Sequence, residues 1–289
     1  MSTSTAPERI LIVRHSIRLD KEQRDWSRGA KRPQDPPITE GGKDLARQLG
    51  SYLRSARLID FKNTVFLVSP LGRCIQTAHA IAEGLTEVVG KEALPTVPIH
   101  IEESLCEGAY WIYQDIVRNR GLRGDNFPPL PIYHNAAFHK ENTSPLVVLH
   151  DQQNPSFALG PAPTFIKTGN DELVEEPRVQ QRCRSGVVGL LNEKRLAGKV
   201  VICVGHGETC QLWAHSLSAV PINEAPTYTG FLEFRPQPVD AATSQQQQQQ
   251  QQVAAGKDKY TTVCGGSPRE SLLKRHTSHR NCPLLEAAH

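Results

Sequence analysis

The chain has 289 residues, of which 38% are hydrophobic, and a formal net charge of +3. This length allows a sizeable core, and so mild a charge excludes the dense basic clusters of a nucleic-acid-binding protein. No apolar run is long enough to cross a bilayer, and the polar start lacks the apolar segment of a secretory signal. Seven scattered cysteines, without a C-x-x-C pair, favour reduced thiols, so we expect a cytoplasmic protein that binds neither nucleic acid nor membrane.

The first predicted strand ends in charged groups. Residues 10–13 are four consecutive apolar residues, which predicts a strand buried on both faces. In open α/β folds the ligand crevice borders the carboxyl ends of the strands, and this strand runs directly into Arg14, His15 and Arg18. Two guanidinium groups beside an imidazole suit a phosphoryl group, held by forked N–H donors while a ring nitrogen faces the phosphorus. The alternative is a strand end with solvated charges.

A long polar connection, residues 19–37, follows this strand, with Trp26 as its one large apolar side chain. It fits either a solvated loop or a lid or specificity loop over the crevice, because long loops in compact domains often carry function. Leucines at helical spacing then predict a helix with Thr39 as its N-cap. Two glycines in its first turn, Gly41 and Gly42, indicate a backbone that comes close to another group.

A second strand-to-helix switch places an arginine in the first turn of a helix. Residues 64–68 predict a buried strand that stops at a Ser-Pro pair, and the next helix contains Arg73 near its start. Free backbone N–H groups and the positive end of the helix dipole suit an anion there. A third strand, 97–101, precedes a short apolar helix at 109–117. Three glutamates lie between them, namely Glu102, Glu103 and Glu107.

The second half of the chain repeats the pattern of a strand that ends in a histidine. A proline-rich segment, 119–170, is interpreted as an irregular insertion over the crevice mouth. A long helix, 173–196, then precedes a buried strand, 200–204, which runs into His206 and a further helix. His206 therefore has the same local surroundings as His15.

The C-terminal part combines predicted strands with low-complexity sequence. Residues 228–235 alternate like an edge strand. An uninterrupted glutamine tract, 245–252, follows, and the region around it, about 236–258, cannot bury enough apolar area to offset its ordering entropy. Because 259–264 predicts another strand, we expect a disordered loop between two neighbouring strands. The whole chain, 1–289, is then a single domain.

Alternating strands and helices predict an α/β fold, a three-layer sandwich in which a mostly parallel sheet has helices on both faces. If the strands are parallel, their charged ends meet at one edge of the sheet. Three guanidinium groups, two imidazoles and one carboxyl group would then surround a space the size of a phosphate, from Arg14, Arg18, Arg73, His15, His206 and Glu107.

Four sequence blocks lie at these positions: LIVRHSIR at 11–18, PITEGG at 37–42, SPLGRCIQTA at 69–78 and VGHG at 204–207. In this order they resemble the R-H-G-x-R, L-T-x-x-G, S-P-x-x-R-x-x-Q-T-A and G-H signatures of the histidine phosphatase superfamily, which has the phosphoglycerate mutase-like fold. The sequence RHSIRLD at 14–20 and the later DPPIT resemble the suppressor-of-T-cell-receptor-signalling branch of phosphatases more than the mutases.

The resemblance implies a phosphomonoester hydrolase that forms a phosphohistidine on His15, with neighbouring arginines favouring the unprotonated ring. The phosphoryl oxygens would be held by Arg14, Arg18, Arg73 and His206. Glu107 is the candidate general acid for the leaving oxygen and later the base for water, with Glu102 and Glu103 as competitors. No metal or cofactor is required.

One residue departs from the family pattern, and several alternatives stay open. Ser16 replaces the usual glycine, and its side chain would narrow the site or weaken a backbone contact with phosphate without removing a charge. A zinc site at Cys203, His206 and Cys210 is disfavoured, because two thiolates from one short segment do not close a tetrahedral site. Cys74 is either an oxidation-sensitive or a buried, inert thiol.

Two other functions fit the same residues. One is a phosphotransferase of the phosphoglycerate mutase type, and the other is a catalytically weak scaffold protein that binds phosphate. The expected partner is a phosphorylated small molecule or a phosphoprotein, and a homodimer is possible.

Overall fold

A computed structural model of the chain describes residues 6–30, 33–86, 99–108, 159–160, 176–218, 221–236 and 260–264. The helix predicted at 109–117, nearly all of the insertion predicted at 119–170 and the glutamine tract lie outside these residues. Among the described residues, no helix is long and apolar enough to cross a membrane.

The strands of the described residues form one sheet in the order β3-β2-β4-β1-β5-β6. Its first four members are parallel, because β4 pairs in parallel with both β1 and β2, and β2 with β3. β5 is antiparallel to both of its neighbours. The strands are β1 (Arg9–Arg14), β2 (Thr64–Val68), β3 (Ile99–Ile101), β4 (Val200–Gly205), β5 (Phe231–Pro236) and β6 (Tyr260–Cys264).

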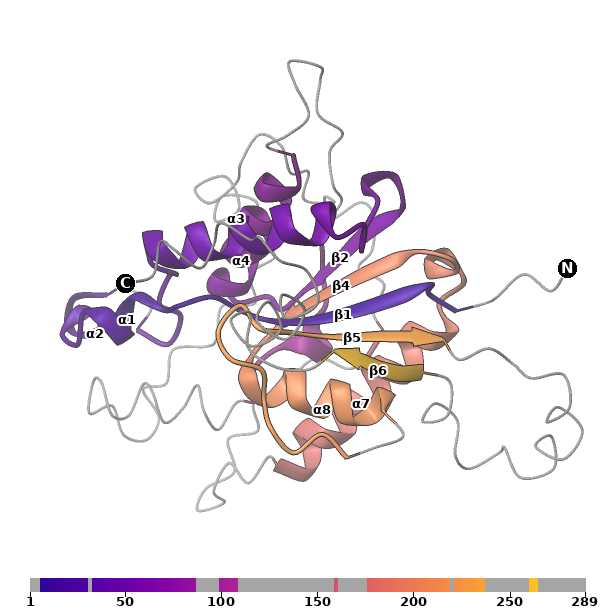
Figure 1. The fold of residues 1–289 in the computed structure, drawn as a ribbon. Coiled ribbons are helices and arrows are strands. Elements are labelled where there is room, and N and C mark those ends of the chain that lie inside the picture. Colours follow the sequence, from indigo (N-terminus) through magenta and orange to yellow (C-terminus); the bar gives the residue numbers. More distant parts are fainter. Residues whose placement is uncertain are drawn as a thin grey trace, which may run out of the picture.

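The long helices cover both faces of this sheet. In Figure 1, α3 and α4 lie on one face and α7 and α8 on the other, which confirms the predicted three-layer α/β sandwich. The helices are α1 (Leu19–Glu22), α2 (Trp26–Gly29), α3 (Glu40–Ser55), α4 (Gly72–Thr86), α7 (Glu176–Asn192) and α8 (Gly207–Leu217). Short 3-10 turns are η1 (Phe61–Asn63), η2 (Glu103–Leu105) and η3 (Lys194–Leu196).

Alternation along β1 divides the apolar core between the two faces. Ile10 and Ile12 belong to the cluster under α7 and α8, whereas Leu11 and Val13 belong to the cluster under α3 and α4. All four side chains are fully buried, as predicted for an apolar run without polar interruptions.

α3 and α4 pack closely on their shared face of the sheet. A Cβ at Gly50 would collide with the backbone of Ile81, and a Cβ at Gly84 with the backbone of Arg47. The close approach therefore depends on two glycines that face the opposite helix. An ion pair of 2.9 Å between Arg47 Nε and Glu83 also links the two helices.

Three predictions about the elements need correction. The edge strand expected at 228–235 is wrong, because β5 lies between β1 and β6. Its alternation suggested an exposed face, yet the side chain of Glu233 is fully buried, where it forms ion pairs with Arg9 (3.3 Å) and Arg235 (2.7 Å).

The connection 19–37 is not a plain solvated loop, since it contains α1 and α2 and is buried at 33–36. The helix expected to reach residue 196 ends earlier, at Asn192, and a 3-10 turn follows.

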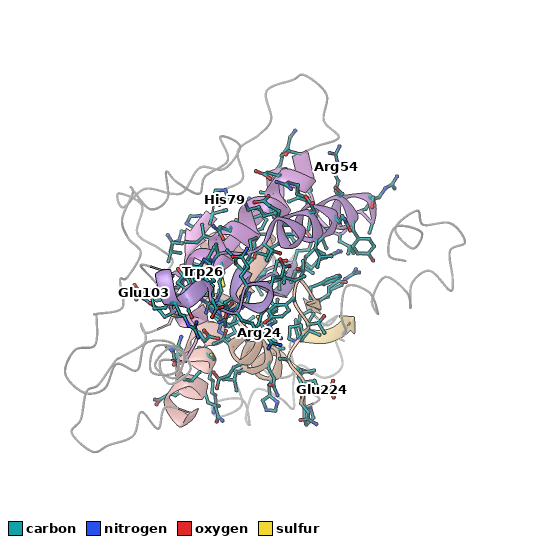
Figure 2. The ribbon with its side chains drawn as sticks, turned by 90° about the vertical axis from the view of Figure 1, so that its left-hand side faces the viewer. Arg24, Trp26, Arg54, His79, Glu103 and Glu224 are labelled. Atoms are coloured by element: carbon teal, nitrogen blue, oxygen red, sulfur yellow. The ribbon has the colours of Figure 1, made fainter. Side chains whose placement is uncertain are left out.

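The register brings the carboxyl ends of four strands to one edge of the sheet. Arg14 is level with Gly205, and Val68 is level with both Val204 and Ile101. Consequently, the segments that follow β1, β2, β3 and β4 begin side by side. Figure 2 views the molecule from this end, where Trp26 of α2 is labelled.

Candidate active site

The two predicted histidines meet at this edge of the sheet. His15 follows β1 directly, and His206 lies between β4 and α8. Their ring centroids are 5.3 Å apart, and the rings are inclined at 64°. Both are buried, with exposures of 2% and 0%. Residues 191 positions apart in the chain are therefore within the reach of a single phosphoryl group, as their matching strand ends predicted.

The hydrogen bond at His15 defines which ring nitrogen carries the lone pair. Nδ1 lies 2.8 Å from the carbonyl oxygen of Ser16, which can only accept, so Nδ1 carries the proton. In the neutral ring, Nε2 is then the nitrogen with a free lone pair. Burial lowers the pKa of His15 well below its usual 6.5, and the positive charges of Arg73, Arg14 and Arg18 lower it further. The ring is therefore neutral at physiological pH.

At His206 both nitrogens are engaged. The Arg73 Nη2 group donates to Nδ1 at 3.2 Å, so the neutral ring carries its proton on Nε2, which donates to Ser69 Oγ at 2.8 Å. Burial, followed by the charge of Arg73, lowers the pKa of His206 well below 6.5. As arranged here, His206 positions Arg73 and Ser69, and an incoming phosphoryl oxygen must replace one of these partners to bond the ring.

Arg73 is the fully buried hub of the site. It lies in the first turn of α4, as predicted, and its Nη1 group donates to the Gln34 carbonyl oxygen (3.2 Å) and to Asp35 (3.1 Å). Its Nη2 group bonds Glu107 as well as His206. Among the described residues, its buried Nε has no hydrogen-bond partner. An anion at the site would satisfy this donor.

The structure gives Glu107 and Glu102 different surroundings. Glu107 forms an ion pair with Arg73 and lies 4.0 Å from His206 Nδ1, with 16% of its side chain exposed. Glu102 is almost fully buried and accepts hydrogen bonds from Ser104 and the Leu159 backbone N–H, so it braces the turn after β3. Glu107 therefore contacts both an arginine and a histidine of the site.

The two arginines near His15 differ in their partners. The Arg14 guanidinium lies 4.3 Å from the centre of the Tyr228 ring, and its Nη1 donates to Pro226 O at 3.1 Å. In the described part of the chain, its Nε is buried without a hydrogen-bond partner. Arg18 instead forms a two-pronged ion pair with Asp20, at 2.9 and 2.7 Å. Both arginines are near enough to lower the pKa of His15.

The Ser16 side chain bonds groups on other segments. Its hydroxyl donates to Gly42 O at 2.7 Å and accepts from Thr229 at 2.8 Å, while its N–H donates to Thr77 Oγ1 at 3.0 Å. A Cβ at Gly42 would lie 3.1 Å from the Ser16 hydroxyl, which explains one of the two glycines at the start of α3. The hydroxyl thus ties the His15 loop to α3 and to the segment before β5.

Several residues of the site escaped the sequence analysis. Asp35 contacts Arg73; it begins the DPPIT segment at 35–39, which contributed to the resemblance without giving Asp35 a role. Tyr228 lies 5.5 Å from the His15 ring, between centroids, and nothing in its sequence surroundings singled it out. Ser69 and Thr77 were inside the S-P-x-x-R-x-x-Q-T-A block without an assigned role, and that block was the signal available for them.

The cysteines and metal ligands give no second chemistry. Within the described residues, no group of three or more histidine, cysteine, aspartate or glutamate side chains could hold a metal. Cys74 is fully buried, and burial raises its pKa well above 9.0, so it is an inert thiol at neutral pH.

The comparisons with known proteins agree with this geometry. Residues 10–119 match the family model of the histidine phosphatase superfamily (branch 1). Over these residues the match agrees with the resemblance that the sequence blocks predicted. No curated protein matches the chain. Placement in the suppressor-of-T-cell-receptor-signalling branch stays a prediction.

Three solved structures are among those that the chain is similar to. The ecdysone phosphate phosphatase from Bombix mori, in complex with tungstate, is 17% identical, with 79% of this chain and 89% of that chain covered and a TM-score of 0.49. A phosphoglycerate mutase from Bacillus anthracis str. Sterne is 14% identical, with 80% and 89% covered and a TM-score of 0.43. A phosphoserine phosphatase mutant from Entamoeba histolytica, in complex with phosphoserine, is 14% identical, with 89% and 95% covered and a TM-score of 0.43.

Proposed function

We propose that this protein is a phosphomonoester hydrolase that transfers the phosphoryl group of its substrate first to His15 and then to water. The observation that carries the proposal is the state of His15, a buried neutral imidazole whose Nδ1–H is held by the Ser16 carbonyl oxygen. This hydrogen bond leaves the Nε2 lone pair for attack. Three arginines lie near enough to stabilise the charge on the phosphoryl oxygens.

In the first step, the Nε2 lone pair of His15 forms a bond to phosphorus while the bond from phosphorus to the leaving oxygen breaks. In this step Glu107 acts as the carboxylic acid, so it must first take up a proton from solvent in place of its ion pair with Arg73; it then gives that proton to the leaving oxygen and becomes a carboxylate. In the second step, Glu107 removes a proton from water, the water oxygen bonds to phosphorus, and the N–P bond breaks. Inorganic phosphate leaves, and both His15 and Glu107 return to their starting states.

The proposed clamp on the phosphoryl oxygens combines hydrogen-bond donors that lack a partner with groups that already have one. Arg14 and Arg73 contribute the buried Nε donors that lack a partner among the described residues. Arg18 and His206 already hold partners and would exchange them for phosphoryl oxygens or act through their charge and position. These assignments are supported by the electrostatic influence of the three arginines on His15 and by the chemistry of guanidinium groups.

The experiment that tests the proposal is hydrolysis of para-nitrophenyl phosphate by the wild-type protein and by His15→Ala. Release of nitrophenol by the wild type alone supports the hydrolase. Phosphopeptide binding without release would point to the scaffold alternative. Isomerisation of added phosphoglycerate would point to the mutase alternative, which the same fold can host.

The substrate class and cellular setting are also part of the proposal. A panel of phosphorylated metabolites and phosphopeptides distinguishes a small-molecule from a phosphoprotein substrate. The cytoplasm is the proposed compartment, because five cysteines are free and buried, namely Cys74, Cys106, Cys183, Cys203 and Cys210. A single domain over 1–289, with loops at 119–170 and 236–258, remains the proposed organisation. A homodimer remains a possibility for sedimentation analysis.

A further inference from the structure

Asp35 occupies a defined place beside the hub of the site. Its carboxylate accepts from Arg73 Nη1 at 3.1 Å through Oδ1 and from the Gly72 backbone N–H at 2.9 Å through Oδ2. The side chain is 2% exposed. The Asp35 carboxylate therefore bonds the Arg73 guanidinium and also the first turn of α4, the helix that carries Arg73. The dipole of α4 favours a negative charge at this end.

The segment that carries Asp35 is fixed along its length. Leu19 N–H donates to Pro37 O at 2.8 Å, and Thr39 N–H donates to Ile17 O at 2.9 Å. The Ile38 N–H donates to the side chain of Gln76 on α4 at 2.9 Å. These bonds hold the segment against the loop after His15 and against α4, so Asp35 is presented to Arg73 by an ordered backbone.

The opposite side of the same guanidinium faces the reacting groups. Arg73 Nη2 bonds Glu107 and His206 Nδ1, while Nη1 bonds Asp35 and Gln34 O. Because a guanidinium is planar and rigid, fixing Nη1 also fixes the direction of Nη2 and of the unpartnered Nε. Without Asp35, the strong attraction between Arg73 and Glu107 would be free to draw the guanidinium toward the acid.

We infer that Asp35 is a positioning residue that holds Arg73 in the orientation needed for phosphoryl transfer. The inference rests on the proposed function. The competing interpretation is that Asp35 imitates a phosphate and is displaced when substrate arrives. The bonds of residues 37–39 favour the first interpretation, because they fix the backbone beside Asp35, and displacement of the carboxylate would in addition break its bonds to Arg73 and to the Gly72 N–H. The two interpretations predict opposite effects of removing the charge.

The test compares Asp35→Asn, Asp35→Ala and the control Glu83→Gln with the wild-type protein. Glu83 forms a similar carboxylate–arginine pair on the helices α3 and α4 but contacts no group of the site. We expect Asp35→Asn to lower kcat for para-nitrophenyl phosphate by about tenfold to a hundredfold, as for a small misplacement of a catalytic group. KM should change much less, and Glu83→Gln should retain the wild-type kcat.

A rescue experiment separates positioning from general structural support. Asp35→Ala removes the carboxylate and leaves room for a small one, so added formate should restore at least part of its kcat. Chloride at the same ionic strength should restore none, and Asp35→Asn should not respond. Melting temperatures are measured on the same samples. An unchanged melting temperature shows that formate restores kcat by binding at the site and not by increasing the fraction of folded protein.

Each outcome decides the inference. A wild-type kcat in Asp35→Asn overturns it. A lower KM, together with tighter binding of inorganic phosphate and an unchanged kcat, also overturns it and identifies a displaced phosphate imitation. Absence of formate rescue in folded Asp35→Ala counts against positioning. If wild type and Glu83→Gln both lack turnover, the hydrolase proposal itself has failed.

Discussion

The ends of β1 and β4 present the same kind of side chain in different surroundings. At the end of β1, His15 has one ring nitrogen bonded to a backbone carbonyl and the other left for chemistry. At the end of β4, His206 bonds Ser69 with one nitrogen and Arg73 with the other. We therefore propose that the two histidines have different roles, set by their hydrogen-bond partners, with His15 as the nucleophile and His206 as part of the clamp.

The largest expected effect is the loss of the nucleophile. His15→Asn should lower kcat/KM for para-nitrophenyl phosphate by about 10,000-fold or more, because phosphoryl transfer loses its acceptor. Steady-state assays at several enzyme concentrations measure this effect. Residual activity within tenfold of wild type would show that His15 is not the nucleophile.

Replacement of the second histidine should have a smaller effect. His206→Asn should lower kcat by about a hundredfold to a thousandfold, the usual cost of one lost group that stabilises transition-state charge. Rapid-quench assays should still detect phosphorylated protein, formed more slowly. A variant that forms no phosphoenzyme at all would make His206 the nucleophile or an essential partner of it.

The acid is tested through the leaving group. Glu107→Gln should lower kcat by about a hundredfold for phosphoserine, whose leaving alkoxide needs a proton, and much less for para-nitrophenyl phosphate. A plot of rate against leaving-group pKa measures the difference. Equal losses on both substrates would assign Glu107 to orienting Arg73 alone.

The two buried histidines also predict how stability depends on pH. Their native pKa values lie well below 6.5, so the unfolded chain binds more protons than the native protein as the pH falls below 6.5. Their contribution is complete above that pH and is lost on acidification, by up to about 1.4 kcal/mol per pH unit for each ring. Urea unfolding between pH 7 and pH 5 measures the slope, and His206→Asn should reduce it. An unchanged slope would contradict buried neutral rings.

The smallest effect is expected at Ser16. Ser16→Ala should lower the free energy of unfolding by about 1–3 kcal/mol, because Thr229 and Gly42 lose their partner in a buried network. KM should stay the same, because the side chain bonds those segments and not the catalytic groups. Ser16→Gly separates the hydroxyl from the added backbone freedom of glycine. A change in KM without a change in the free energy of unfolding would show that the Ser16 side chain affects substrate binding instead.

The strand ends could be predicted from the sequence because each is an apolar run, followed by a histidine within two residues in β1 and β4 and by a Ser-Pro turn into a helix that contains an arginine in β2. This local pattern located His15, Arg73 and His206, and parallel pairing then brought them together. Glu233 misled the same reasoning, because its burial depends on ion pairs with Arg9 and Arg235 that no local pattern reveals.

Loop residues that reach the site only because their loop packs against it could not be predicted in this way. Asp35 meets Arg73 across 38 positions, only because the segment before α3 returns along the edge of the sheet. Tyr228 reaches His15 and Arg14 from the turn before β5. In both cases the contact is set by where a loop packs, and loop composition carries little information on that point.

The measurement that tests the division between the two strand ends most directly is the location of the transferred phosphate. Wild-type protein is mixed with para-nitrophenyl phosphate, quenched rapidly under alkaline conditions that preserve phosphohistidine, and analysed by peptide mass spectrometry and phosphorus NMR. The account predicts one phosphate on Nε2 of His15. Phosphate on His206, on Nδ1 of His15 or on a carboxylate would contradict it.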